Sequence, residues 1–586
     1  GRPAPRAHRR ARRPAVSGAA QGLVRLPVWR ARLVLIALGA GFVLLAGRSL
    51  YLQAVKTDFL QEKGDARYSR VMEIAATRGR ILDRNGEALA VSTPVRSVWA
   101  IPADIEASGA ERRQLAALLS LTRIELDKRL SDTSRDFVYL KRLVPPEAAA
   151  AVLALGLKGL HDHSEYRRYY PGGEVTAHVV GFTGVDDSGQ EGIELAHQQT
   201  LGGKAGSRRV IRDRLGRIVE DVESIRGAQH GSDLALAIDS KVQSLAFGAL
   251  KSAVERHRAK AGGVIVVDVR SGEVLALANL PSYNPNNRAR VSAAQVRNRV
   301  ITDLFEPGST LKPFTIALAM ETGKVGPSTV VHTAPGRFTL AQYTIRDAQP
   351  AAALTVAQVV QKSSNVGTAK IALGLPREAM WDLYRRVGFG TAPELGFPGA
   401  ASGKLRNHRG WRPVEQATIG YGYGISVSLA QLARAYTVFA RDGELVPLTL
   451  VKTGVAASGE KILSAEAARA VRAMLELAVQ PGGTGPRARI MGYRVAGKTG
   501  TAHKQENGGY APDKYLASFV GFAPASAPRL IVAVMLDEPS AGQHYGGAVA
   551  APVFAQVMQG ALRLFGVPHD APLEPPGEGE EAKEST

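Results

Sequence analysis

The alternation of apolar and polar residues divides the chain into segments of different character. Residues 33–47 form an uncharged apolar run, and Tyr51, Leu52 and Val55 extend it beyond Arg48. A helix that crosses a bilayer needs about 17–25 mostly apolar residues, and the long Arg48 side chain can reach the far interface. The pattern predicts one membrane-spanning helix over 33–55. A cleaved signal peptide and a buried core helix are the two alternatives.

Residues 56–231 show a mixed pattern of short strands and helices. Residues 78–92 read as strand, turn and strand around Asn85-Gly86, a strong hairpin signal. Helical periodicity covers 110–121 and 145–157, and the Gly-rich stretch 169–194 indicates loops between short elements. No group of catalytic residue types occurs here, so we expect an interaction or spacer domain.

A larger domain is expected over 232–571. Residues 262–280 read as two apolar strands joined at Arg270-Ser271-Gly272, and three more strands are expected between 493 and 539. Helices are expected after Ser309, Ser363 and Ser428 and at 551–565. A sheet with helices from before and after it in the chain predicts one α/β domain. The tail 572–586 is rich in Pro, Gly and Glu and predicts disorder.

Composition narrows the function. The chain has 586 residues, a net charge of +21 and no cysteine, which fits at least two domains and excludes disulfides, thiolate catalysis and thiolate metal sites. Residues 1–32 carry nine arginines and no acid. Beside an apolar run, this excess predicts a cytoplasmic arm and places everything after the helix outside the cytoplasm. The scattered histidines indicate no metal site, and His161-Asp162-His163 is expected in a solvated loop.

The first candidate for chemistry is Ser309-Thr310-Leu311-Lys312, where an apolar helical pattern begins. Residues i and i+3 of a helix share a face. Burial disfavours the ammonium form of a lysine, and a neutral amine can take the serine proton. Free N–H groups at the helix start can face an oxyanion. Taken alone, S-x-x-K more often marks a capping serine and a solvated lysine.

Two further motifs follow in the order that serine acyl-transfer enzymes with S-x-x-K require. Ser363-Ser364-Asn365 comes about fifty residues later, and Lys498-Thr499-Gly500 with Thr501 comes near the end. Copies of all three motifs also occur in the wrong order, at 282–284, 452–454 and 458–461. The ordered set, and not any single motif, therefore carries the prediction.

With their flanks, "FEPGSTLKPF", "QKSSNVG", "VAGKTGTA" and "YGGAVAAPVF" resemble class B penicillin-binding proteins, most closely the septal peptidoglycan D,D-transpeptidases. The resemblance implies a transpeptidase domain with an antiparallel sheet flanked by helices, an elongated α+β membrane-proximal domain and one N-terminal transmembrane helix. It covers roughly residues 30–565 and includes "RGRILDRNGEALA" and "GQEGIE".

The resemblance also implies the catalytic roles. Ser309 would attack the carbonyl of the penultimate D-Ala of a stem pentapeptide, with Lys312 as general base. Ser363 would help pass the proton to the leaving amine, and Lys498 would supply positive potential. No cofactor or metal is implied.

The remaining implied residues bind substrate or line the pocket. Two threonines would hold the substrate carboxylate, one asparagine would bind the peptide backbone, and two tyrosines would form an aromatic wall beside His544. The substrate-binding set is Asn365, Thr499, Gly500, Thr501, Tyr515 and Tyr545. The backbone N–H groups of Ser309 and Thr501 would form the oxyanion hole.

The resemblance implies stem peptides ending in D-Ala-D-Ala as substrates, β-lactams as covalent inhibitors, and a membrane glycan-strand polymerase with other division proteins as partners. No nucleic acid is expected. The location would be the bacterial inner membrane, single-pass, with the catalytic domain periplasmic. An elongation-specific transpeptidase is the main alternative. A β-lactam sensor is disfavoured because we find a single apolar span, and a class A β-lactamase because no E-x-x-L-N occurs between Asn365 and Lys498.

Overall fold

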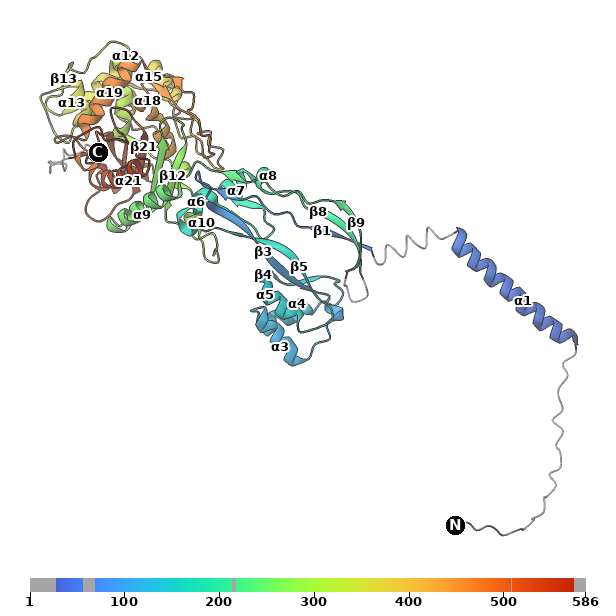
Figure 1. Ribbon diagram of the computed structural model, residues 1–586. Coiled ribbons are helices and arrows are strands. Elements are labelled where there is room, and N and C mark those ends of the chain that lie inside the picture. Colours follow the sequence, from blue (N-terminus) through green and yellow to red (C-terminus); the bar gives the residue numbers. More distant parts are fainter. Residues whose placement is uncertain (1–27, 56–68, 213–217, 507, 574–586) are drawn as a thin grey trace, which may run out of the picture. The chain divides into compact units, whose positions relative to one another are not determined.

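The computed structural model describes residues 28–55, 69–212, 218–506 and 508–573 (Figure 1). The predicted arginine-rich arm, up to residue 27, and the predicted tail, from residue 574, lie outside the described residues. The chain divides into two compact units, one of residues up to 72 with 208–224, the other of residues 73–207 with 225 onward.

The first unit contains the apolar helix and a small sheet. Helix α1 runs over Val28–Leu50 and continues as one π-helical stretch, Tyr51–Val55. Its residues are exposed, and Val28–Gln53, with a mean hydropathy of 2.1, is long and apolar enough to cross a membrane. The helix thus begins five residues before the predicted start at 33. Strands β1 (Ser69–Ile74), β8 (Gly206–Arg212) and β9 (Ile218–Arg226) pair in the order β1-β8-β9.

The N-terminal part of the second unit is built on a five-stranded sheet. The strands are β2 (Ile81–Leu82), β3 (Ala88–Ala100), β4 (Val138–Val144), β5 (Leu160–Tyr169) and β10 (Leu234–Ala235), in the order β10-β2-β3-β4 with β5 also on β3. Helices α3 (Gly109–Leu118), α4 (Arg123–Leu130) and α5 (Pro146–Leu153) pack against it through a core that includes Val98 and Leu140.

The predicted hairpin at Asn85-Gly86 is confirmed. Gly86 has φ of +88°, which the turn requires and glycine adopts readily. One carboxylate oxygen of Asp83 accepts hydrogen bonds from the backbone N–H groups of Asn85 and Glu87 at 2.8 and 2.9 Å. The stretch "RGRILDRNGEALA" therefore closes a local turn between β2 and β3.

A buried ion-pair network fixes the Gly-rich stretch. The Glu194 carboxylate in α7 (Gly192–Ala196) contacts Arg78 Nε at 2.5 Å and Arg168 Nε at 2.7 Å, and the three side chains are at most 1% exposed. Removing one partner from such a group strands a buried charge. This network gives "RGR" and "GQEGIE" a structural explanation without catalysis.

The interpretation of His161-Asp162-His163 as a solvated loop is wrong. These residues lie within β5, paired with β3. The His161 ring stacks on Trp99 with centroids 4.4 Å apart, and His163 Nε2 lies 3.2 Å from a carboxylate oxygen of Glu165. Ring stacking and cross-strand pairing made these polar residues compatible with a sheet.

The large domain is built around an antiparallel sheet in the order β12-β11-β21-β20-β19. Its strands are β11 (Ala261–Asp268), β12 (Val274–Leu280), β19 (Ala496–Glu506), β20 (Gly509–Ala523) and β21 (Leu530–Asp537). The predicted strand pair at 262–280, the three late strands and the closing helix are confirmed. Strands β11, β12 and β21 are buried along their whole length and are almost uniformly apolar, whereas β19 and β20 have polar, partly exposed ends.

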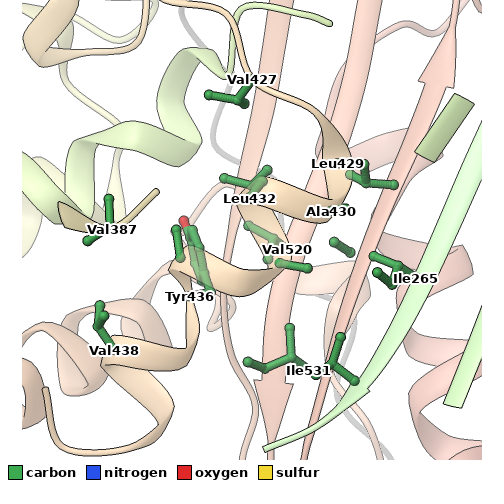
Figure 2. Close-up of a cluster of buried hydrophobic side chains, with 14 of the residues drawn as sticks. Ile265, Val387, Val427, Leu429, Ala430, Leu432, Tyr436, Val438, Val520 and Ile531 are labelled. Carbon is green, nitrogen blue, oxygen red and sulfur yellow. The ribbon is translucent and has the colours of Figure 1, made fainter. Parts of the chain in front are cut away.

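Helices cover both faces (Figure 1). Helices α9 (Ser240–Arg256) and α21 (Ala551–Leu564) pack on the face that carries Val264 and Val266. The other face carries Ile265 and meets α17 (Leu429–Ala435). Figure 2 shows this second core, with Val520 and Ile531 of the sheet facing residues of α17 and Tyr436 just beyond it.

The second unit has further helices and strands, of which α20 belongs to the first core and β14 and β15 to a separate small cluster. The helices are α6 (Ala177–Val180), α8 (Gln198–Leu201), α10 (Ala293–Val296), α11 (Arg299–Thr302), α12 (Lys312–Glu321), α13 (Val356–Gln361), α14 (Asn365–Leu373), α15 (Arg377–Arg386), α16 (Pro413–Gly420), α18 (Thr437–Ala440), α19 (Ala465–Ala478) and α20 (Gly546–Val549). The strands are β6 (Phe182–Thr183), β7 (Gly189–Glu191), β13 (Val330–His332), β14 (Arg337–Leu340), β15 (Tyr343–Arg346), β16 (Ala353–Thr355), β17 (Glu444–Leu445) and β18 (Glu460–Lys461).

Candidate active site

Ser309 lies in a tight turn and not in a regular α-helix. Gly308–Leu311 is a 3-10 turn, η4, which leads directly into α12 at Lys312. Gly308 has φ of +53°, a conformation that suits glycine. The Tyr436 hydroxyl, visible in Figure 2, donates to the Thr310 carbonyl at 2.8 Å and ties the turn to the core. Ser309 is therefore held on a rigid base, 3% exposed.

The Lys312 amine points at the second motif. Lys312 is completely buried, and its Nζ donates to Ser363 Oγ at 3.0 Å and to the Ser363 carbonyl at 2.5 Å. The residues are 51 positions apart in sequence. The apolar flanks of Lys312, including Phe314 and Ile316, are also fully buried. The amine is thus buried and hydrogen-bonded to the turn that carries Ser363.

The second motif forms a strained turn at the start of α14. Ser363 has φ of +60°, uncommon for a residue with a side chain. Ser364 caps the helix by accepting from the Gly367 N–H at 2.8 Å, and its hydroxyl donates to the Asp347 carboxylate at 2.7 Å. Asp347 also accepts from the Val366 N–H at 2.9 Å. The serine in the middle of this motif therefore has a positioning task that an alanine could not perform.

The third motif lies on β19, the edge strand of the sheet. Lys498 is fully buried, and its Nζ donates to Thr484 Oγ1 at 3.2 Å and Thr499 Oγ1 at 3.1 Å. The Thr501 hydroxyl oxygen accepts from the Gly546 N–H at 3.0 Å. An edge strand keeps backbone groups that can pair with an extended peptide.

Close glycine packing brings β19 against the Ser309 turn. A Cβ added to Gly500 would lie 3.0 Å from the Pro307 carbonyl oxygen and 2.9 Å from Thr310 Cγ2. A Cβ on Gly308 would lie 3.2 Å from the Thr501 carbonyl oxygen. The three sequence motifs therefore meet at one place, although they span about two hundred residues of the chain.

The resemblance to penicillin-binding proteins implies acylation by penicillin, and replacing Gly500 by alanine is expected to slow it about 10-fold. The new methyl group would lie 2.5 Å from Ser518 Oγ on β20 as well as against the turn, so the Ser518 side chain and β19 must both shift. Overpacking of this kind costs roughly 1–3 kcal/mol. Stopped-flow acylation and denaturant unfolding check the two effects. Gly509→Ala is the matched control, because no heavy atom lies within 4 Å of its added Cβ. Equal acylation of the Gly500 variant and the control would contradict the packing argument.

Aromatic rings line the strand beyond Thr501. The Tyr515 ring stacks on His544 with centroids 3.8 Å apart and planes 13° apart. The His544 ring lies 4.4 Å from Tyr545, and His503 lies 4.5 Å from Tyr515. The predicted tyrosines are thus joined by an imidazole, which occupies the place of a third carbocyclic ring. Whether this row contacts a ligand stays a prediction.

The competing motif copies lie elsewhere. Ser458 and Lys461 are exposed, at the β17–β18 pair. Lys452, Thr453 and Gly454 are exposed too. Among the described residues, no group of three or more His, Asp or Glu side chains is placed to hold a metal ion.

Two contributors escaped the sequence analysis. Thr484 bonds to both Lys498 and Thr499, with its Oγ1 2.7 Å from Thr499 Oγ1. It lies in Gly482-Gly483-Thr484-Gly485, whose glycines predict a turn but do not predict which residues the turn contacts. Asp347 follows the β14–β15 hairpin, and no spacing rule connects it to Ser364, 17 residues later.

Comparison with known protein families identifies the domains that contain this geometry. Residues 262–559 match the penicillin binding protein transpeptidase domain, and residues 73–236 match the penicillin-binding protein dimerisation domain. The first match ends within α21, and the second covers the five-stranded sheet in the N-terminal part of the second unit.

Whole-chain relatives agree with the domain matches. The chain is 44% identical over 548 residues to the probable peptidoglycan D,D-transpeptidase PenA of Neisseria gonorrhoeae, covering 93% of this chain and 94% of the relative. It is 42% identical over 549 residues to the peptidoglycan D,D-transpeptidase FtsI of Escherichia coli, covering 93% of each. A solved structure, the apo TP domain of Burkholderia pseudomallei penicillin-binding protein 3, has 50% identity and a TM-score of 0.54, covering 57% of this chain and 98% of that one.

Proposed function

We propose that the chain cross-links stem peptides at the division septum through an acyl-enzyme on Ser309. The premise is that the chain belongs to the class B penicillin-binding proteins and is a peptidoglycan D,D-transpeptidase. One observation supports this site above all. The buried Lys312 residue lies one turn from Ser309, and its amine is hydrogen-bonded to Ser363. Strand β19 packs against the turn that carries Ser309.

In the acylation half, the Ser309 oxygen attacks the carbonyl carbon of the penultimate D-Ala. Its proton passes to Lys312 Nζ, which burial and the surrounding apolar side chains keep from strong hydration. Negative charge develops on the former carbonyl oxygen, facing the N–H groups of Ser309 and Thr501. Collapse breaks the peptide bond, and the terminal D-Ala leaves with a proton delivered through Ser363.

Substrate is held by the third and second motifs. The hydroxyls of Thr499 and Thr501 bind the terminal carboxylate in the field of Lys498, a charge-assisted arrangement stronger than neutral hydrogen bonds. Asn365, whose amide donates to the Arg346 carbonyl at 3.2 Å, retains its side-chain oxygen for the peptide backbone.

In the second half, an amine of a neighbouring stem peptide attacks the ester carbonyl. Lys312 accepts the proton of the incoming amine, and the Ser309 oxygen leaves as a hydroxyl with a proton returned by Lys312 or Ser363. One ester bond breaks and one amide bond forms, which is the cross-link. A β-lactam resembles D-Ala-D-Ala and acylates Ser309 in the same way, but its opened ring leaves no small fragment to depart.

The chain is organised for work outside the membrane. We assign residues 1–32 to the cytoplasm, 33–55 to the bilayer, 56–231 to a partner-binding domain and 232–571 to a periplasmic transpeptidase. Positive charge before the helix supports this orientation. The membrane-proximal part has a buried structural ion-pair network, and its surface is available for the glycan-strand polymerase and other division proteins.

Depletion of the protein in growing cells tests the septal role. Loss of septal cross-linking leaves elongation intact, so we expect long filaments that wild-type protein rescues and Ser309→Ala does not. Immunodetection must show equal amounts of both proteins in the membrane fraction. Round, swollen cells on depletion would instead assign the enzyme to side-wall elongation.

A further inference from the structure

A buried carboxylate lies three residues before Ser309. Glu306 is 9% exposed, and its Oε1 accepts three hydrogen bonds. The donors are the Gly424 N–H at 2.7 Å, Gln505 Nε2 at 3.0 Å and the Tyr510 hydroxyl at 3.1 Å. They come from the loop after α16, from β19 and from β20. One oxygen atom therefore joins three segments that lie 118 to 204 residues away.

This carboxylate is held at an energetic cost. Its second oxygen, Oε2, is buried without a hydrogen-bond partner, and no ion pair involves Glu306 among the described residues. Burial raises the pKa of Glu306, and burial followed by the nearby Glu306 charge raises the pKa of Tyr510 to about 12. A buried carboxylate without a cation is unfavourable for folding. The hydrogen bonds that Glu306 makes to other segments must offset this cost of burying its carboxylate.

The segment of Glu306 and one of the segments it bonds, β19, carry the two proposed oxyanion donors. The segment before Ser309 is fixed to the loop after α16 by backbone bonds, with Phe305 N–H to the Val427 carbonyl at 3.0 Å and Gly308 N–H to the Gly422 carbonyl at 3.1 Å. Strand β19 carries Thr501, four residues before the Glu306 donor Gln505. The two oxyanion donors therefore belong to different segments: Glu306 lies on the segment of Ser309 and is hydrogen-bonded to Gln505 on the strand of Thr501.

We propose that Glu306 is a positioning residue that fixes the β19–β20 hairpin against the Ser309 turn and so sets the separation of the two oxyanion-hole N–H groups. This inference rests on the proposed roles of Ser309 and Thr501. All three donors converge on Oε1, so the role needs a hydrogen-bond acceptor at that point and not a negative charge. A glutamine side chain offers the same acceptor.

Acylation of the full chain in detergent micelles by a fluorescent penicillin tests the role. Stopped-flow traces over a range of penicillin concentrations separate the acylation rate constant from the pre-acylation dissociation constant. Loss of one oxyanion donor lowers rates about 10²–10³-fold, and a displaced donor should lower them less. We expect Glu306→Ala to reduce the acylation rate constant about 10- to 100-fold with the dissociation constant within about 3-fold. Glu306→Gln should keep both within about 3-fold of wild type.

Glu506→Gln is the matched control. Glu506 is an exposed carboxylate on the same hairpin, and it forms a surface ion pair with Lys514 at 2.8 Å. This variant should be acylated at the wild-type rate. A Glu306→Ala rate equal to wild type would refute the inference. So would a Glu306→Gln variant as slow as the alanine variant, because charge and not the acceptor would then matter. If the alanine variant does not fold, Gln505→Ala with Tyr510→Phe removes two donors and should also slow acylation selectively; a normal rate for this pair overturns the proposal.

The same experiment separates this inference from the proposed function. Labelling that persists in Ser309→Ala would show that the nucleophile assignment has failed. Absent labelling in Ser309→Ala together with normal rates in Glu306→Ala would leave the nucleophile in place and reject Glu306 alone.

Discussion

Replacing Ser309 by alanine is expected to remove covalent penicillin labelling, a loss of roughly 10⁴-fold or more in acylation. The hydroxyl is the atom that forms the ester, and no neighbouring group can substitute for it. Removing the side-chain oxygen of one buried serine leaves the 3-10 turn and its Tyr436 hydrogen bond to Thr310 unchanged, so the fold should persist. Gel fluorescence after incubation with labelled penicillin measures the result, and circular dichroism verifies the fold.

The chain contains its own control for this prediction. Ser458 and Lys461 repeat the S-x-x-K spacing, but both are exposed. The Lys461 amine donates to the Asp442 carbonyl at 2.7 Å, outside this copy of the motif, and we expect it to take no part in acylation. Ser458→Ala should label as wild type. Full labelling of Ser309→Ala, or loss of labelling in Ser458→Ala, would contradict the assignment.

The grouping of residues within each motif could be predicted from the sequence because each motif is local. Lys498, Thr499 and Gly500 are consecutive, and Ser309 and Lys312 are three residues apart, so the residues of each motif stay close together whatever the rest of the fold. The apolar residues around Lys312 predicted its burial, which the structure confirms, and Lys498 is fully buried as well, which was not predicted. Even here the local detail differs, since Gly308–Leu311 is a 3-10 turn and the helix begins at Lys312.

Contacts between distant segments could not be predicted. Asp347 holds Ser364, Thr484 holds Lys498, and Glu306 reaches Gln505 over 199 positions. Periodicity reports which face of an element is apolar, but it does not report which loops meet once the elements pack. His161 illustrates the same limit, because its polarity suggested a loop while its partner Trp99, remote in sequence, makes it part of a sheet.

Replacing Lys312 by methionine is expected to slow acylation about 10²- to 10⁴-fold, the usual contribution of a general base. Methionine has a similar length and no amine, so the apolar surroundings remain filled. The Ser363 hydroxyl and carbonyl each lose a donor, which costs about 1–3 kcal/mol. Removing a buried amine offsets part of that cost. The free energy of unfolding should therefore change by less than about 3 kcal/mol, although the acylation rate falls by orders of magnitude.

Denaturant unfolding and stopped-flow acylation of the same preparation distinguish these two quantities. Lys324→Met is the matched control, because this exposed lysine lies just beyond α12 and donates to the Gly374 carbonyl. It should acylate at the wild-type rate. Wild-type acylation by Lys312→Met would remove the lysine from the mechanism and leave Ser309 without an identified base.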